Sequence, residues 1–113
     1  MEIKSLKEYQ EFSETSFKKQ ILFKKGENVV FNLNFMPGQG LPLHKHPGAQ
    51  VYILVLNGSG EVQVGEEKTE VTTGEVIYLE GEELFAFKNT SNMNASLYVF
   101  LSKIPDERYA TEV

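Results

Sequence analysis

The sequence predicts an all-β protein built as a sandwich or a barrel. Short segments rich in β-branched and aromatic residues recur about every 8 to 12 residues, with glycine and asparagine between them. Phe31, Leu33 and Phe35 alternate with asparagines, which is the period of a strand buried on one face. A chain of 113 residues has the length of one domain and can bury one substantial core.

The expected elements follow from local patterns. Ser5 and Glu8 have the spacing of a capping box, and apolar residues recur every third position, which predicts a short helix over residues 5–12. Asn57 and Gly58 are typical of a type I′ hairpin turn, because that turn needs positive φ at both positions. A polar tail is expected over residues 104–113. Besides the segment that carries the histidines, strands are expected at residues 16–23, 27–36, 51–56, 61–64, 68–72, 75–79, 84–88 and 95–101.

Composition excludes several function classes. No apolar run approaches the roughly 20 residues that a membrane helix needs, and the N-terminus lacks the pattern of a secretory signal. A net charge of −5 argues against nucleic acid as a partner. The absence of cysteine excludes disulfides and thiolate chemistry. We therefore expect a cytoplasmic protein without membrane or nucleic-acid partners.

The chain contains only two histidines, His44 and His46, and they stand two positions apart. On an extended strand such residues project from the same face, so two neutral imidazoles could hold a divalent metal together. Gln50 follows a short bend and could offer an amide oxygen to the same point. The alternative is a pair of histidines on a half-exposed strand that binds nothing.

The surroundings of the histidines carry a resemblance to a known family. Gly38, His44 and His46 have the spacing Gly-x5-His-x-His, Gln50 follows after three residues, and the next strand ends at Gly58. This resembles the first motif of the cupin family, which has a glutamate three or four residues after the second histidine.

A second stretch resembles the second cupin motif, Gly-x5-Pro-x-Gly-x2-His-x3-Asn. Gly74 and Asn89 agree with that pattern. Glu80 replaces the proline, Gly81 stands one place early, and Phe85 occupies the position of the histidine. The resemblance covers about residues 29–101. It implies a double-stranded β-helix, a jelly-roll barrel, with residues 1–113 as a single cupin domain.

The resemblance also implies a metal site. Cupins commonly hold a metal with two histidines and a carboxylate from the first motif and a third histidine from the second. Carried over by position, His44 and His46 are present, the carboxylate falls on Gln50 or Val51, and the last histidine becomes Phe85. Gln50 is preferred, because glutamine replaces glutamate in some metal-binding cupins. Such a site would hold zinc, nickel, iron, copper or manganese weakly.

Four aromatic residues are expected to line a ligand pocket in the barrel, Tyr52, Tyr78, Phe85 and Phe87. For the two phenylalanines, which stand two positions apart, the alternative is a purely structural place in the core. Glu80, Glu82 and Glu83 crowd one turn, where solvated carboxylates are the simplest interpretation.

Two functions from different classes are compatible with these residues. The first is a non-catalytic or weakly catalytic module that binds a small molecule in the barrel, with a loosely held divalent metal. The second is a metal-dependent enzyme of the dioxygenase, decarboxylase or sugar-processing type, in which substrate completes the coordination. The missing carboxylate and histidine favour the binding module.

A homodimer is the expected assembly. Jelly rolls leave edge strands, and residues 17–23 are the natural segment to cover the edge of a neighbouring subunit. Residues 61–83 hold eight glutamates and one lysine. Solvation of a hairpin edge explains this excess, and docking of the basic N-terminal strand on the acidic edge of a second subunit is the alternative.

Overall fold

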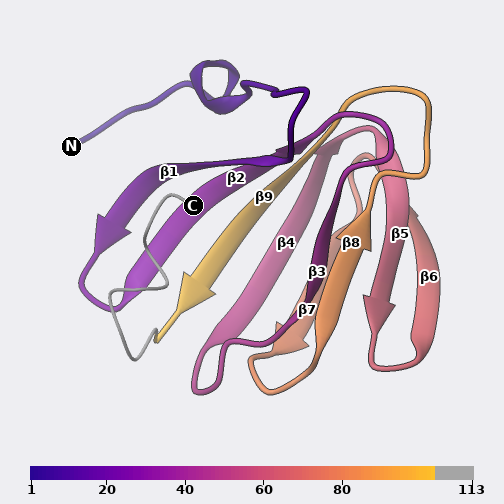
Figure 1. Ribbon diagram of the computed structural model, residues 1–113. Helices are drawn as coiled ribbons and strands as arrows, with labels where there is room; N and C mark the ends of the chain where they lie inside the picture. The colour runs from indigo at the N-terminus through magenta and orange to yellow at the C-terminus, as the bar shows by residue number, and fades with distance from the viewer. Residues whose placement is uncertain (104–113) are drawn as a thin grey trace.

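The computed structural model describes residues 1–103, which fold into two antiparallel sheets that pack face to face (Figure 1). The five-stranded sheet has the order β1-β2-β9-β4-β7, and the four-stranded sheet has the order β3-β8-β5-β6. The all-β prediction is confirmed. The strands are β1 (Lys18–Lys25), β2 (Asn28–Phe35), β3 (Gly40–His44), β4 (Gln50–Asn57), β5 (Ser59–Val64), β6 (Glu67–Thr72), β7 (Val76–Glu80), β8 (Phe85–Lys88) and β9 (Ala95–Ser102).

The core lies between the two sheets and follows the period of two along each strand. On β2 the buried inward residues are Val29, Phe31, Leu33 and Phe35. The neighbouring strands β9 and β4 contribute Leu97, Val99, Leu101, Val51, Ile53 and Val55 to the same cluster, and the four-stranded sheet adds Val62, Val71, Phe85 and Phe87. Burying such side chains supplies the main driving force of folding.

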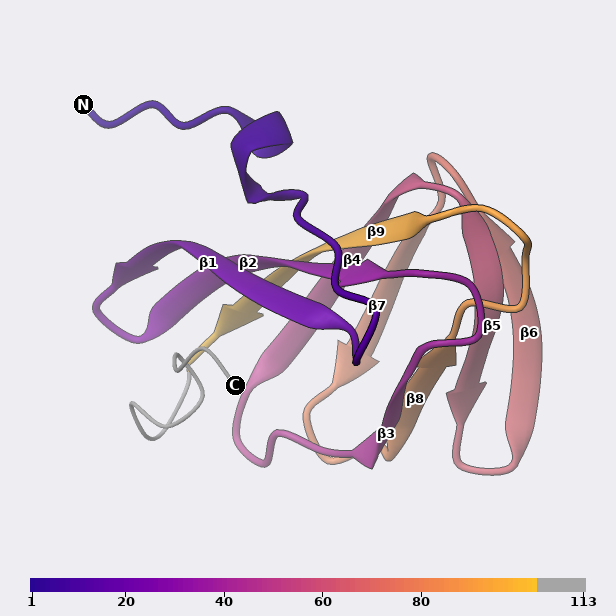
Figure 2. The ribbon, with the colours of Figure 1, turned by 45° about the horizontal axis from the view of Figure 1, so that its top comes forward.

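The prediction of a hairpin at Asn57 and Gly58 is wrong. The turn is a corner at which the chain passes from β4 in the five-stranded sheet to β5 in the four-stranded sheet (Figure 2). Only Gly58 of the pair has positive φ, at 85°. A Cβ at this position would collide with Ala95 and with the carbonyl oxygen of Asn94. Glycine is needed for this close approach, which the dipeptide pattern alone could not distinguish from a hairpin.

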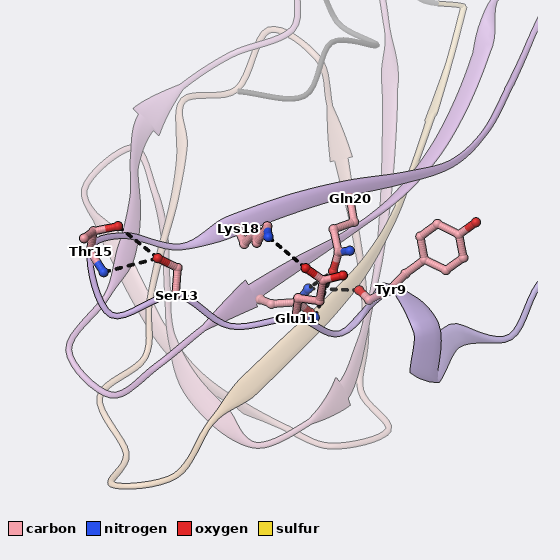
Figure 3. Close-up of polar contacts among 7 residues, drawn as sticks. Tyr9, Glu11, Ser13, Thr15, Lys18 and Gln20 are labelled. Carbon is pink, nitrogen blue, oxygen red and sulfur yellow. Dashed lines mark hydrogen bonds and ion pairs between the residues drawn. The ribbon is translucent and has the colours of Figure 1, made fainter.

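The N-terminal segment covers part of the outer face of the five-stranded sheet. The predicted helix is present as a single 3₁₀ turn, Leu6–Tyr9, and the predicted capping box is absent because Ser5 makes no side-chain cap. Beyond the turn, Glu11 contacts β1: its N–H donates to Oε1 of Gln20, and its carboxylate pairs with the ammonium of Lys18 (Figure 3). The carbonyl of Tyr9 accepts hydrogen bonds from the buried amides of Asn32 and Asn34, at 3.2 and 2.9 Å. The asparagines that alternate along β2 therefore anchor this segment.

No helix among residues 1–103 is long and apolar enough to cross a membrane. The polar tail expected over residues 104–113 lies outside the described residues. The cytoplasmic location and the organisation of the whole chain as a single domain stay predictions.

Candidate functional site: a cavity beside two histidines

A cavity of about 200 Å³ lies between the two sheets. Its walls are apolar side chains from both sheets, and its polar groups come mainly from β1, from the end of β3 and from the β7–β8 turn. The apolar lining consists of Phe17, Phe31, Leu33, Leu41, Val51, Ile53, Leu79, Phe85 and Val99. The remaining lining residues are Lys19, His44, Lys45, His46, Glu80, Gly81 and Glu83.

A β-bulge turns His44 toward the cavity. Leu41 pairs with Phe87 of β8, but the next pair is His44 with Phe85, so β3 holds one more residue than its partner between the two pairs. Strict alternation from Leu41 would have turned Leu43 inward and His44 outward. The extra residue reverses this, because a bulge re-aims the side chains that follow it. Accordingly His44 lines the cavity, while Leu43 is 47% exposed.

His46 reaches the same cavity from a loop, because β3 already ends at His44. The prediction that one extended strand carries both histidines is therefore wrong. Backbone hydrogen bonds hold the loop: the N–H of His46 donates to the carbonyl of Gly81 at 2.8 Å, and the N–H of Gly81 donates to the carbonyl of Ala49 at 2.9 Å. A Cβ on Gly81 would collide with the carbonyl oxygens of His46 and Ala49. Glycine is therefore required at position 81, where the β7–β8 turn lies against the backbone of His46 and Ala49.

The two imidazoles lie edge to face, with ring centres 4.9 Å apart. Nδ1 of His44 lies 2.8 Å from the carbonyl of Pro42 and must carry a proton to donate to it. In the neutral ring, Nε2 of His44 is then an acceptor. Burial, followed by the charges of His44 and Lys19, lowers the pKa of His46 to about 4. At neutral pH His46 is therefore an uncharged base.

Phe85 stands beside the histidines. Its ring centre lies 5.8 Å from that of His44, and its side chain is buried in the cavity wall. The structure thus brings His44, His46 and Phe85 together, as the alignment with the cupin motifs requires. Phe87 does not line the cavity and instead packs in the core against Phe35, at 4.9 Å between ring centres.

Gln50, Tyr52 and Tyr78 lie on the opposite face of the sheet, so the prediction that they point into the barrel is wrong. Val51 is the inward residue at the start of β4, and alternation turns its neighbours Gln50 and Tyr52 outward. Oε1 of Gln50 accepts a hydrogen bond from Ser102 at 3.3 Å on that outer face. Of the two positions left open for the carboxylate, the inward one is a valine.

The donor set does not match the four-ligand metal site of the cupin motifs. Within residues 1–103 no group of three or more His, Cys, Asp or Glu side chains could hold a metal ion. The place of the third histidine is taken by the apolar ring of Phe85, and no carboxylate follows on β4. Two imidazoles remain, which supply nitrogen ligands but no negative charge to balance a dication.

Sequence reasoning missed two cations of the lining, Lys19 and Lys45. Lys19 lies on β1, where lysines occur on both faces, so periodicity gave no signal for its direction. Lys45 lies between the histidines, where alternation along one extended strand would turn it away from them. That alternation does not apply, because Lys45 follows the end of β3.

The fold and the site together define a class: a small jelly-roll barrel with a histidine pair beside an apolar cavity. The sequence profile of the cupin domain matches residues 20–101, which is most of the chain. The protein belongs to the cupin family, and its fold is the double-stranded β-helix of that family.

Solved structures agree with this assignment. The protein TT1209 from Thermus thermophilus is 27% identical and superposes with a TM-score of 0.87, over 93% of this chain and 100% of that one. A conserved protein with a double-stranded β-helix domain from Klebsiella pneumoniae has 19% identity and a TM-score of 0.87, covering 93% and 92% of the two chains. An RmlC-like cupin from Desulfovibrio desulfuricans has 22% identity and a TM-score of 0.76, covering 88% and 95%. A comparison with functionally curated proteins finds no match.

Acid should destabilise the native protein through His46. Its pKa of about 4 in the folded state lies below the ordinary value of 6.5, so between these pH values the unfolded chain binds more protons than the folded one. The free energy of unfolding should fall as the pH drops through this window, and less so in His46→Gln. Urea unfolding of chelator-treated protein near pH 7 and near pH 5 measures the difference. His44→Gln should keep most of the native pH dependence, and equal losses in native protein and His46→Gln would contradict the assignment.

Restoring the missing histidine should create a tighter metal site. Native protein should bind zinc or nickel weakly through His44 and His46, and Phe85→His should raise the affinity by about tenfold or more, which requires only about 1.4 kcal/mol of added binding free energy. Titration calorimetry on folded variants measures this. His44→Ala in the Phe85→His background is the control and should remove the gain. If the folded Phe85→His variant binds zinc or nickel with the affinity of the native protein, position 85 does not lie at the metal site.

Proposed function

We propose that this cupin is a binding module that holds a small, largely apolar molecule in its barrel, with little or no catalysis. The observation that supports this proposal is the cavity of about 200 Å³, whose walls are mainly apolar side chains of both sheets. Pockets of this type gain affinity from apolar burial and orientation from a few polar groups. Here the polar side chains of the lining are Lys19, His44, Lys45, His46, Glu80 and Glu83.

The histidine pair supports a second candidate function, metal-assisted catalysis. Both rings reach the cavity wall, and Nε2 of His44 is directed away from its bond to Pro42 as an acceptor. A divalent metal bound there would supply Lewis-acid chemistry to a ligand in the cavity. The incomplete donor set is more consistent with a loosely held metal, so the binding module is preferred.

Filling the cavity should abolish ligand binding. Val51 is an inward wall residue, whereas Val76 is 70% exposed on the outer face of the same sheet. Val51→Phe should therefore reduce the affinity for a neutral aromatic probe such as 2-phenylethanol, and Val76→Phe should leave it unchanged. Ligand-observed NMR titration measures both. Equal binding by the native protein and the folded Val51→Phe variant would contradict a ligand in the barrel.

We also propose that the chain forms a homodimer through an exposed aromatic face. The N-terminal segment that was expected to cover a neighbour's edge forms β1, the edge strand of the five-stranded sheet, and pairs with β2 of the same chain. The interface proposed here is a different surface. The aromatic face lies on the outer side of β4, β7 and β9 and consists of Tyr52, Leu54, Val76, Tyr78, Tyr98 and Phe100.

Register makes this face continuous. Tyr52 stands opposite Tyr78 on one side and Phe100 on the other, and its ring lies 5.1 and 5.7 Å from theirs. Exposed apolar patches of this kind on a monomer mark interaction sites. A second copy is the proposed occupant, because a two-fold axis lays the same sheet face on itself and repeats every contact.

Charge on the aromatic face should yield monomers. Val76 on the face and Met93 in the β8–β9 loop are both 70% exposed, so either substitution by lysine should cost the isolated chain little. Light scattering at tens of micromolar protein should give a dimer mass for the native protein and Met93→Lys, and a monomer mass for Val76→Lys. A monomeric native protein would refute the dimer, and a dimeric Val76→Lys would place its interface elsewhere.

A further inference from the structure

The ring of His44 is held by the strand that carries it. Nδ1 lies 2.8 Å from the carbonyl oxygen of Pro42 in the same strand, and only a protonated Nδ1 can donate to that oxygen. The rings of His46 and Phe85 pack against it, with centres 4.9 and 5.8 Å away. The neutral ring then keeps one lone pair, on Nε2. Because Nε2 is at the end of the ring away from the backbone, and His44 lines the cavity, this acceptor is presented to a ligand there.

The ionised side chains of the cavity lining balance one another. They are Lys19, Lys45, Glu80 and Glu83. Oε2 of Glu83 accepts the N–H of Glu80 at 2.9 Å, so this carboxylate is engaged within the turn. With both imidazoles neutral, two positive and two negative groups leave the lining without a formal net charge. Such a lining selects neither an anion nor a cation, and an ion loses far more hydration on burial among apolar side chains than a neutral group does.

We propose that the ligand is a neutral molecule with an apolar body and one hydroxyl group, which donates to Nε2 of His44. This inference rests on the proposed small-molecule function and names its ligand class. The body lies against the apolar wall, and a volume of about 200 Å³ limits it to a single ring or a short chain. A hydroxyl fits the site because its O–H satisfies the imidazole lone pair without bringing a charge into the cavity.

Two probes of the same skeleton test the hydrogen bond. 2-Phenylethanol and (2-fluoroethyl)benzene have nearly the same size, but only the alcohol can donate. His44→Leu removes the acceptor and should lower the ratio of the two affinities about fivefold, the size expected for one neutral hydrogen bond. His46→Leu removes the neighbouring imidazole and should leave the ratio unchanged. The ratio cancels changes of cavity shape that affect both probes, and chelator-treated protein excludes a bond through a metal.

Two charged analogues test the neutral class. Phenylacetate and 2-phenylethylammonium carry opposite charges near the place of the hydroxyl. Native protein should bind each of them about tenfold or more weakly than the alcohol, because the lining has no net charge to offset the lost hydration. Ligand-observed NMR titration at about pH 8 gives the affinities, and circular dichroism checks the fold of each variant.

A measurement on the native protein does not depend on any variant folding. In ¹⁵N spectra of labelled protein, the resonance of the unprotonated Nε2 of His44 should move upfield when 2-phenylethanol is added, because an accepted hydrogen bond engages its lone pair. The fluoride should leave it in place. A resonance that the bound alcohol does not move would overturn the inference.

The outcomes separate this inference from the proposed function. An affinity ratio unchanged in folded His44→Leu would overturn the hydroxyl contact and leave the apolar binding module intact. A ratio that falls in His46→Leu instead would also overturn it, since the acceptor would then be the other histidine. Tighter binding of either charged analogue than of the alcohol would overturn the neutral class. Failure of native protein to bind any of these probes would count against the binding module itself, and the inference would fall with it.

Discussion

The alternation of side chains across two packed sheets is the constraint on which the rest of this structure depends. Because successive residues of a strand face opposite sides, burying Val51, Ile53 and Val55 of β4 between the sheets forces Gln50, Tyr52 and Leu54 to the outside. The same rule on β7 and β9 assembles the outer aromatic face. The inner apolar wall and the exposed patch are therefore two consequences of one packing requirement.

The candidate site arises where that alternation is interrupted. The bulge in β3 turns His44 inward out of phase, and the loop after β3 brings His46 to the same cavity. Gly81 makes the second interruption possible, because only a residue without a Cβ lets the β7–β8 turn bond directly to the backbone at His46 and Ala49. The two stretches that resemble the cupin motifs thus meet through backbone hydrogen bonds.

The donor set around the cavity differs from that of a four-ligand metal site. The two imidazoles share the cavity lining with Lys19, Lys45, Glu80 and Glu83, and burial together with neighbouring charge keeps His46 uncharged at neutral pH. Phe85 fills the position from which a third imidazole would come. The result is a cupin barrel that retains the two histidines of the motif beside a cavity lined mainly by apolar side chains.

The sequence by itself determined the all-β class of fold, the succession of strands along the chain and the identity of the histidine pair. These follow from local periodicity and from motif spacing, which do not depend on the partner against which a strand packs. The placement of Gln50, Tyr52 and Tyr78 could not be settled in this way, because β4 and β7 are largely apolar runs whose two faces look alike in sequence. The inward turn of Lys19, the bulge before His44 and the sheet-changing corner at Gly58 were likewise decided only by the tertiary structure. Each depends on which neighbouring strand a segment pairs with, and such pairing joins residues far apart in the chain.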